Sequence, residues 1–177
     1  FIAWVGRQGL KPTDTVICYD GGAGANASRL WWMLRWVGHE QVRVLDGGLA
    51  KWQREGRPVT AEVPRFEPGT YAGKAKASMH ASLAVVEKKL KRAALIDSRA
   101  PARYRGESEP IDPVAGRIPG AKNRYNNDNL SAEGVFKSPE SLRAEFETVL
   151  AGRTPGEVIH YCGSGVAACH NALAMEI

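Results

Sequence analysis

A repeated pattern constrains the fold of this chain more than any other feature of its sequence. Residues 16–21 (VICYDG) correspond to residues 158–163 (VIHYCG), and the two copies lie about one domain length apart. In each copy a short β-prone run leads into a loop of small residues and then into an amphipathic helix pattern. The repeat therefore predicts two similar α/β domains within one chain.

The N-terminal part of the chain alternates between strand and helix patterns. β-prone runs lie at residues 16–19 and 42–45, and helix patterns follow at residues 25–37 and 49–56. Gly38 is a plausible cap for the first of these helices. This order of elements is typical of a parallel sheet flanked by helices, so we expect that architecture here.

The C-terminal part shows the same alternation. Helix patterns begin at Ser82 and Ser138, strands are predicted at residues 95–97 and 158–161, and a turn-rich stretch covers residues 99–125. Each of the two helix patterns carries its apolar residues on one face, namely Leu83, Val86 and Leu90, and Leu142, Phe146 and Leu150.

These patterns divide the chain into three parts. Residues 1–57 are predicted to be the C-terminal part of an incomplete first domain. Residues 79–177 are predicted to form a second domain that stops before its C-terminal end. Residues 58–78 contain prolines and glycines without strong periodicity, which predicts a linker with a short strand near Tyr71.

The net charge of +5 and the pI of about 9.2 suit anionic small molecules. The densest basic cluster falls in a helix pattern without interleaved aromatic residues, which predicts a solvated helix face and no nucleic-acid partner. It consists of Lys88, Lys89, Lys91 and Arg92. No apolar run is long enough to cross a bilayer, so no membrane association is expected.

The chain contains three cysteines, Cys18, Cys162 and Cys169. An odd number without regular spacing argues against a disulfide framework and predicts a reducing compartment, with the cytoplasm as the default location. Cys18 falls inside a predicted strand and Cys169 inside a predicted helix, so both are predicted to be structural.

Cys162 is the candidate reactive residue because it lies between a predicted strand and the start of a predicted helix. Main-chain N–H groups of a small-residue loop can converge on its sulfur, and the helix dipole adds positive potential there. Both effects stabilise a thiolate, and equally the anion of a persulfide. Gly163 and Gly165 allow the loop to curl, and Ser164 offers a hydroxyl.

Cys162 and the residues after it (CGSGVA) resemble the active-site loop of the mercaptopyruvate sulfurtransferase branch of the rhodanese superfamily. Other segments resemble the catalytic domain of that family in the same order: residues 96–99 (IDSR), 103–106 (RYRG), 109–110 (EP) and 116–123 (GRIPGAKN). Residues 45–48 (LDGG) with Trp52 resemble the end of the family's non-catalytic first domain. The resemblance implies two rhodanese-like domains, and Asp20 in place of cysteine makes the first one non-catalytic.

This resemblance implies a sulfurtransferase that works in two covalent steps. Cys162 takes sulfur from a small anionic donor, 3-mercaptopyruvate or thiosulfate, and a thiol, a thioredoxin-like protein or cyanide then accepts it. Arg103 matches the arginine that orients the anionic group of the donor, and Asp97 matches a supporting position beside the loop. The implied substrate-binding loop comprises Gly163, Ser164, Gly165, Val166 and Ala167. Neither a cofactor nor a metal is expected.

Two positions point to different donors. Gly163 and Ser164 favour mercaptopyruvate, because the thiosulfate branch favours basic residues there. Asp112 stands where the mercaptopyruvate branch often carries a second arginine, and it is more like the thiosulfate branch. We expect mercaptopyruvate to be preferred, because the loop contacts the reacting sulfur. Arg117 replaces the histidine of a family turn, and we expect that change to alter packing only.

Other functions fit the sequence less well. A cysteine phosphatase needs an arginine at the sixth position after its cysteine, where this chain has Ala168. Cys162, Cys169 and His170 lack the spacing of a zinc module, and residues 21–24 lack the full dinucleotide-binding frame. A non-enzymatic rhodanese module that binds or regulates a partner is the main alternative, although such modules usually lack the cysteine.

Overall fold

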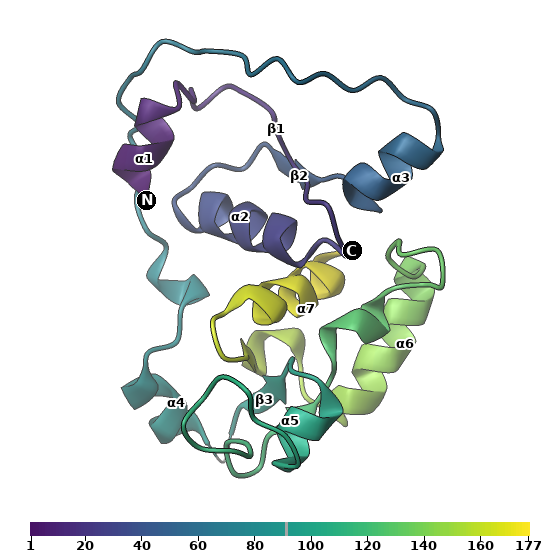
Figure 1. Ribbon diagram of the computed structural model, residues 1–177. Coiled ribbons are helices and arrows are strands. Elements are labelled where there is room, and N and C mark those ends of the chain that lie inside the picture. Colours follow the sequence, from purple (N-terminus) through teal and green to yellow (C-terminus); the bar gives the residue numbers. More distant parts are fainter. Residues whose placement is uncertain (91) are drawn as a thin grey trace. The chain divides into compact units, whose positions relative to one another are not determined.

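The computed structural model describes residues 1–90 and 92–177, so Lys91 of the predicted basic cluster lies outside the described residues (Figure 1). The chain divides into two compact units, Phe1–His80 and Ala81–Ile177. Each unit contains parallel strands and helices, which confirms the predicted fold class. The finer domain limits at residues 57 and 79 stay a prediction.

The first unit follows the predicted order of strands and helices. Its elements are α1 (Ile2–Arg7), β1 (Val16–Cys18), α2 (Ala25–Trp36), β2 (Val42–Val44), α3 (Gly48–Arg54) and a 3-10 turn, η1 (Ala77–Met79). β1 and β2 pair in parallel, with Val16 opposite Val42. α2 ends just before Gly38, whose φ of +93° favours glycine, so the predicted cap is confirmed.

The segment after α3 forms no strand near Tyr71, so that prediction is wrong. The chain instead runs against the C-terminal end of α2, where the N–H groups of Lys74 and Lys76 donate main-chain hydrogen bonds to the carbonyls of Val37 and Trp36. Tyr71 is buried, and its hydroxyl forms a hydrogen bond of 2.9 Å with His39, which is also buried. Tyr71 therefore contributes to the packing of this unit, and the extended segment around it does not join a sheet.

The second unit contains a three-stranded parallel sheet with the order β4-β3-β5. Its elements are α4 (Leu83–Lys89), β3 (Ala94–Asp97), α5 (Pro101–Arg105), β4 (Lys122–Asn123), the 3-10 turn η2 (Asn126–Asn129), α6 (Pro139–Leu150), the 3-10 turn η3 (Pro155–Glu157), β5 (Val158–Tyr161) and α7 (Val166–Glu176). β3 lies in the centre, and all four of its residues are buried. The ends of β3 and β5 therefore lie side by side, with Asp97 opposite Tyr161.

The two amphipathic helices of this unit have different surroundings. Ser138 caps α6 and Pro139 occupies its first turn, and the predicted apolar face of this helix is buried in the core. Ser82 caps α4 as predicted, by accepting a hydrogen bond from the N–H of Val85. Two residues of its predicted apolar face are exposed, Leu83 at 74% and Leu90 at 39%, whereas Val86 is half-buried. The periodicity thus predicted both helices, but it did not predict the packing of α4.

A buried polar network fixes α7 to the carboxyl ends of the neighbouring strands. The Asn171 amide donates to Ser98 Oγ at 2.9 Å and to the Arg124 carbonyl at 2.8 Å. Asn171 Oδ1 accepts a hydrogen bond of 2.7 Å from Asn129, which is fully buried as well. Because each of these groups is satisfied inside the core, the network holds α7 in one position on the sheet.

Candidate active site at the start of helix α7

Cys162 lies in a short loop between β5 and α7. Gly165 caps α7 with a φ of +84°, in the left-handed region that glycine adopts without strain. This turn directs the Gly165 N–H at the Cys162 sulfur, and the N···Sγ distance is 3.0 Å. Cys162 as a residue is half-buried, and its sulfur is held by this main-chain N–H. One main-chain N–H therefore donates to the sulfur, and the predicted convergence of several such groups stays a prediction.

Asp20 occupies the corresponding place in the first unit, between β1 and α2. Its carboxylate accepts four main-chain hydrogen bonds of 2.9 to 3.1 Å, from Gly22, Gly24, Asn26 and Ala27. Burial alone would raise the pKa of Asp20, but these N–H groups lower it below its ordinary value. The first unit therefore contains a loop of the same kind, and that loop stabilises an anion, the Asp20 carboxylate.

The two loops match most closely at the residue that caps the helix. Gly24 has φ +83° and ψ 3°, and Gly165 has φ +84° and ψ −2°. Gly24 comes four positions after Asp20, whereas Gly165 comes only three positions after Cys162. The loop of the second unit is therefore one residue shorter, and in both loops the N–H of the capping glycine reaches the side chain, at 3.1 Å from Asp20 Oδ1 and 3.0 Å from Cys162 Sγ.

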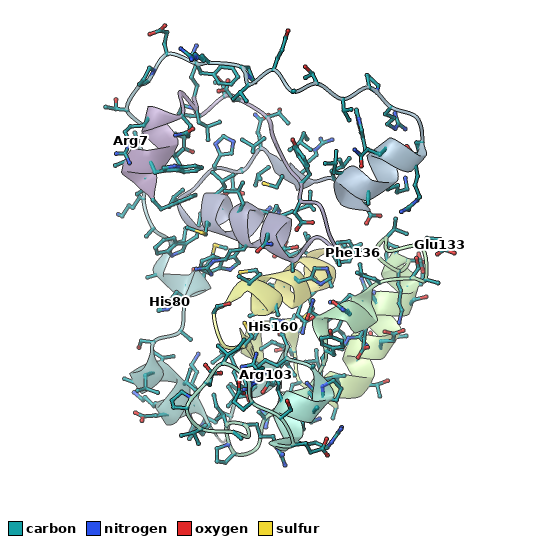
Figure 2. All side chains as sticks on the ribbon, in the orientation of Figure 1. Arg7, His80, Arg103, Glu133, Phe136 and His160 are labelled. Atoms are coloured by element: carbon teal, nitrogen blue, oxygen red, sulfur yellow. The ribbon has the colours of Figure 1, made fainter. Side chains whose placement is uncertain are left out.

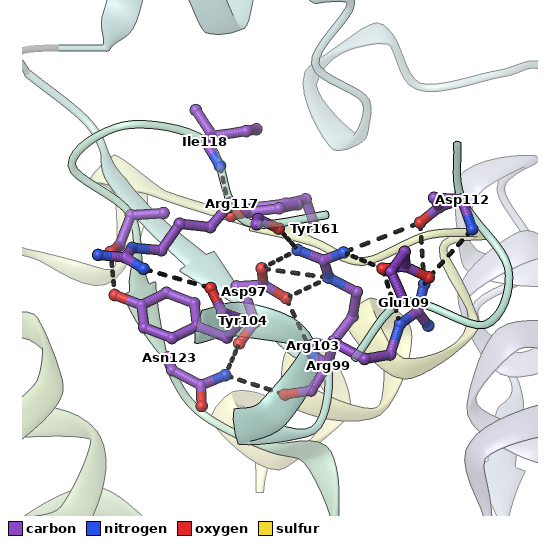
Figure 3. Close-up of polar contacts among 12 residues, drawn as sticks. Asp97, Arg99, Arg103, Tyr104, Glu109, Asp112, Arg117, Ile118, Asn123 and Tyr161 are labelled. Carbon is purple, nitrogen blue, oxygen red and sulfur yellow. Dashed lines mark hydrogen bonds and ion pairs between the residues drawn. The ribbon is translucent and has the colours of Figure 1, made fainter. Parts of the chain in front are cut away.

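Arg103 lies on α5 (Figure 2), and its guanidinium is close to Gly163, the residue that follows Cys162. A Cβ atom on Gly163 would lie 3.7 Å from Arg103 Nη2 and 3.5 Å from Asp112 Oδ2. Arg103 itself donates to Glu109 Oε1 at 2.6 Å and to Asp112 Oδ2 at 2.9 Å (Figure 3). The structure thus brings the predicted donor-binding arginine next to the loop, although two carboxylates already contact it.

Asp97 is fully buried at the end of β3 and pairs with Arg99. Both of its oxygens accept hydrogen bonds from the Arg99 guanidinium, and Oδ1 also accepts the Arg99 main-chain N–H (Figure 3). The hydrogen bonds that Arg99 donates to Asp97 raise the pKa of Arg99 above its usual value. Asp97 lies opposite Tyr161, the residue directly before Cys162, and its predicted supporting role stays a prediction.

Tyr161 connects this ion pair to the turn at residues 116–120. Its hydroxyl accepts a hydrogen bond of 3.2 Å from the Ile118 N–H. Burial, together with the nearby Asp97 charge, raises the pKa of Tyr161. Arg117 of the same turn stacks over the Tyr104 ring at 4.4 Å and donates to the Tyr104 carbonyl. Arg117 is therefore engaged in packing, in line with the sequence-based expectation.

The remaining residues of the predicted loop differ in exposure. Gly163 and Ser164 are exposed, whereas Val166 and Ala167 are half-buried at the start of α7. The contacts of Glu109 were not predicted from the sequence. This side chain is only 5% exposed and receives hydrogen bonds from both Arg99 and Arg103. The alternation of arginines and carboxylates within residues 97–112 was the available signal for this cluster.

The other two cysteines, which are predicted to be structural, are both buried. Burial raises the pKa of the Cys18 thiol to about 11, so this thiol stays protonated at neutral pH. Cys169 is 4% exposed within α7. No group of three or more histidine, cysteine or acidic side chains gathers as a metal site within residues 1–90 and 92–177.

These features define a class of protein in which a cysteine at a strand–helix junction is held by its own loop. The sequence profile of the rhodanese-like domain matches residues 3–55 and 82–176. The chain therefore belongs to the rhodanese-like domain family. Its fold class and the resemblance of its motifs are both confirmed by this match.

Individual proteins and solved structures of this family are also similar to the chain. The chain is 45% identical over 172 residues to a probable 3-mercaptopyruvate sulfurtransferase of Pseudomonas aeruginosa, covering 96% of this chain and 61% of the relative. It is 40% identical over 181 residues to a thiosulfate sulfurtransferase of Bos taurus, covering 98% and 61%. The crystal structure of SseA from Escherichia coli, a 3-mercaptopyruvate sulfotransferase, matches with a TM-score of 0.83 at 32% identity, covering 98% of this chain and 66% of that one. The chain thus spans about 61% of the length of these curated relatives.

Within the part of the chain that the structure describes, no helix combines the length and the apolar character needed to span a bilayer.

Proposed function

We propose that the second unit of this chain is the catalytic domain of a sulfurtransferase that carries sulfur as a persulfide on Cys162. The observation that carries this proposal is the hydrogen bond from the Gly165 N–H to the Cys162 sulfur, at the start of α7. A main-chain donor and the positive end of a helix favour an anionic sulfur over a neutral one. An anionic sulfur is the attacking group in the first step and the product of that step.

The Asp20 loop provides independent support from the same chain. There a loop with the same capping geometry surrounds a carboxylate with four N–H donors. A persulfide extends the cysteine side chain by one atom, so its outer sulfur reaches further into such a loop than the thiol does. We infer that the main chain after Cys162 stabilises the persulfide as the main chain after Asp20 stabilises the carboxylate.

The proposed reaction has two steps. The Cys162 thiolate attacks the sulfur of 3-mercaptopyruvate, so that an S–S bond forms and the C–S bond breaks. The released electron pair stays on carbon, which takes up a proton to give pyruvate. With thiosulfate the same attack breaks the S–S bond of the donor and releases sulfite. A thiolate or cyanide then attacks the outer sulfur of the persulfide and returns Cys162 as a thiolate.

We favour 3-mercaptopyruvate as the donor. Gly163 has no side chain, so the residue after Cys162 does not itself compete with a keto acid for Arg103, whose Nη2 lies 3.7 Å from the Gly163 Cβ position. A planar guanidinium is suited to a carboxylate through paired N–H groups. The relative from Pseudomonas aeruginosa, named a probable 3-mercaptopyruvate sulfurtransferase, supports the same choice. Thiosulfate is the second candidate, supported by the relative from Bos taurus.

The proposed acceptor is a small thiol or a thioredoxin-like protein, and no nucleic-acid or membrane partner is proposed. We also infer a cytoplasmic location, because none of the three cysteines forms a disulfide in the described structure and a reducing compartment preserves a reactive thiol. We further propose that the chain is a tandem arrangement in which the Asp20 unit is non-catalytic.

Sulfur loading tests the proposal directly. The purified, reduced protein is treated with 3-mercaptopyruvate without acceptor, and mass spectrometry then measures its intact mass and locates the modification. We expect a gain of one sulfur atom on Cys162, no gain in a Cys162→Ala variant, and an unchanged gain in a Cys18→Ala variant. If the parent protein gains no sulfur from either donor, or if Cys162→Ala still turns over, the proposed function is wrong.

A further inference from the structure

The segment that follows α5 is a loop with closed ends. Gly106, which ends α5, has a φ of +80°, and Gly116 has a φ of +103°, so both lie in the left-handed region that favours glycine. A Cβ atom on Gly106 would lie 3.4 Å from the main-chain N and Cα of Gly116. Residues 107–115 therefore form an Ω-loop, a compact loop whose two ends meet.

Glu109 holds this loop from the inside. Its side chain is 5% exposed, and its Oε1 accepts the main-chain N–H groups of Ile111 and Asp112 at 3.1 Å and 3.0 Å. The same oxygen accepts a hydrogen bond of 2.6 Å from Arg103 Nη2 (Figure 3). The loop is thus fixed by hydrogen bonds within its own unit, so a partner would meet a surface that is already formed.

Residues 110–115, which we call the apolar loop, expose mostly apolar side chains. Ile111 is 75% exposed and Val114 is 78% exposed. The other exposed residues of the apolar loop are Pro110, Pro113 and Ala115. Its one charged side chain is Asp112, which is paired with Arg103 at 2.9 Å. The apolar loop therefore presents neighbouring apolar residues without a free charge, and exposed patches of this kind mark interaction sites.

The apolar loop borders the loop that carries the reactive sulfur. Asp112 Oδ2 lies 3.5 Å from the Cβ position of Gly163, the residue directly after Cys162. Gly163 and Ser164 are exposed as well. Cyanide is small enough to reach an outer sulfur on Cys162 without contacting the apolar loop. A folded protein that brings a thiol to the same sulfur also covers the surface around it.

From this adjacency, and resting on the sulfurtransferase activity proposed above, we propose that the apolar loop is the docking surface for a protein acceptor. The partner that fits it carries its thiol within an apolar, uncharged surface, because a charged group would lose its hydration against Ile111 and Val114 without gaining an opposite charge. The thiolate of the docked acceptor attacks the outer sulfur of the Cys162 persulfide. The S–S bond to Cys162 breaks, a new S–S bond forms on the acceptor, and Cys162 leaves as a thiolate.

Single-turnover transfer tests this surface. Cys162 is loaded with sulfur from 3-mercaptopyruvate, the excess donor is removed, and mass spectrometry follows the loss of the added sulfur to reduced thioredoxin or to cyanide. A loop variant carries both Ile111→Ser and Val114→Ser. We expect its second-order rate constant to fall at least about tenfold with thioredoxin and to stay within about twofold of the parent protein with cyanide. The matched control carries Val59→Ser and Val63→Ser in the first unit, where these valines are 61% and 84% exposed, and it should transfer to both acceptors like the parent.

The opposite results have clear meanings. Parent-like transfer from the loop variant to thioredoxin overturns the inference, and so does an equal loss with cyanide, which would place the effect at Cys162 itself. An equal loss in the control variant overturns it as well, as does a parent protein that transfers to thioredoxin no faster than to the same concentration of 2-mercaptoethanol. Thermal unfolding of both variants checks the fold, and Ile111→Ser alone takes the place of the double substitution if the latter is unstable.

Sedimentation velocity tests a second copy of the chain as the occupant of the apolar loop. A dimer of the parent protein that the loop variant loses, together with unchanged transfer to thioredoxin, assigns the apolar loop to self-association and overturns the inference. A parent and a loop variant with the same oligomeric state, together with the loss of transfer to thioredoxin, support the protein acceptor.

Failure of this inference is distinguishable from failure of the proposed function, because loading needs only the donor and precedes docking. If the parent protein does not load sulfur on Cys162, the proposed function fails and the docking surface fails with it. If the parent loads and transfers to cyanide, while the loop variant matches it with thioredoxin, only the docking surface is wrong.

Discussion

The main-chain nitrogen of Gly165 lies 3.0 Å from the sulfur of Cys162, three positions earlier in the chain. This contact depends on the left-handed conformation of Gly165, at which the chain turns from β5 into α7. The equivalent glycine of the first unit, Gly24, directs its N–H at the carboxylate of Asp20. The two units therefore use the same backbone conformation at the capping glycine. The side chain at Asp20 or Cys162 decides which anion that glycine N–H stabilises.

Replacing Gly165 by alanine tests the importance of this turn. A φ of +84° costs a residue with a Cβ atom about 1 to 2 kcal/mol, so relief of the strain should move the N–H away from the sulfur. We expect Gly165→Ala to lose about that much unfolding free energy and to slow sulfur loading of Cys162 by at least about tenfold. Urea unfolding and time-resolved mass spectrometry provide the two measurements. Gly156→Ala is the control, because Gly156 is exposed with open space at its Cβ position, and a similar slowing there would contradict the explanation.

The buried pair of Asp97 and Arg99 predicts a large effect on stability. Asp97→Asn removes one charge and leaves the 8% exposed Arg99 without its main partner. Breaking a buried pair in this way costs about 3 kcal/mol or more. Urea unfolding at neutral pH measures this loss, and Glu107→Gln should lose less than about 1 kcal/mol because its pair is exposed. Equal losses in the two variants would show that the burial of Asp97 is unimportant.

His160 predicts a dependence of stability on pH. Burial lowers the pKa of His160 to about 4 from its ordinary value of 6.5, and its Nδ1 has no hydrogen-bond partner among the described residues. The unfolded chain therefore binds a proton at pH values where the folded chain does not. The stability that His160 contributes is present above pH 6.5 and is lost as the pH falls from 6.5 to 4.

A His160→Phe variant should show a weaker decline in stability than the parent protein between pH 6.5 and 4.5, because phenylalanine does not titrate. The urea midpoint, measured at several pH values in this window, tests this expectation. His80 is exposed, so His80→Gln should decline like the parent. Parallel curves for the parent protein and His160→Phe would refute the assignment.

The Asn171 network predicts that a single amide stabilises α7 strongly. Asn171→Ala removes three buried hydrogen bonds. The Arg124 carbonyl and the Asn129 amide each lose the partner that Asn171 provided. Each unmet buried group costs about 1 to 3 kcal/mol, so we expect a total loss of about 3 kcal/mol. Thermal or urea unfolding checks this value. Asn127 is an exposed asparagine of the neighbouring turn, and Asn127→Ala should change stability by no more than about 0.5 kcal/mol. A loss in Asn171→Ala no larger than in this control would argue against the network.

Features that follow from a local pattern in the chain could be predicted from the sequence alone. The strands around residues 16–18 and 158–161, the caps at Ser82 and Ser138 and the buried face of α6 all appear where the patterns predicted them. These features depend on residues that are close together in the sequence. A short stretch of the chain therefore contains the periodicity and the capping residues that predict them. The position of Cys162 at a strand–helix junction belongs to this group, and so does the family resemblance.

Features that depend on contacts between distant parts of the chain could be established only from the tertiary structure. The turn-rich stretch at 99–125 contains α5 and the two-residue strand β4, which are too short to show a period. The placement of Arg103 and Asp112 beside Gly163 depends on how this stretch packs against the loop after β5. Contacts between residues so far apart in the chain reflect packing and charge balance, which no local pattern contains. The sequence by itself therefore determined where the sulfur stands in the fold, and only the tertiary structure decided which charges surround it.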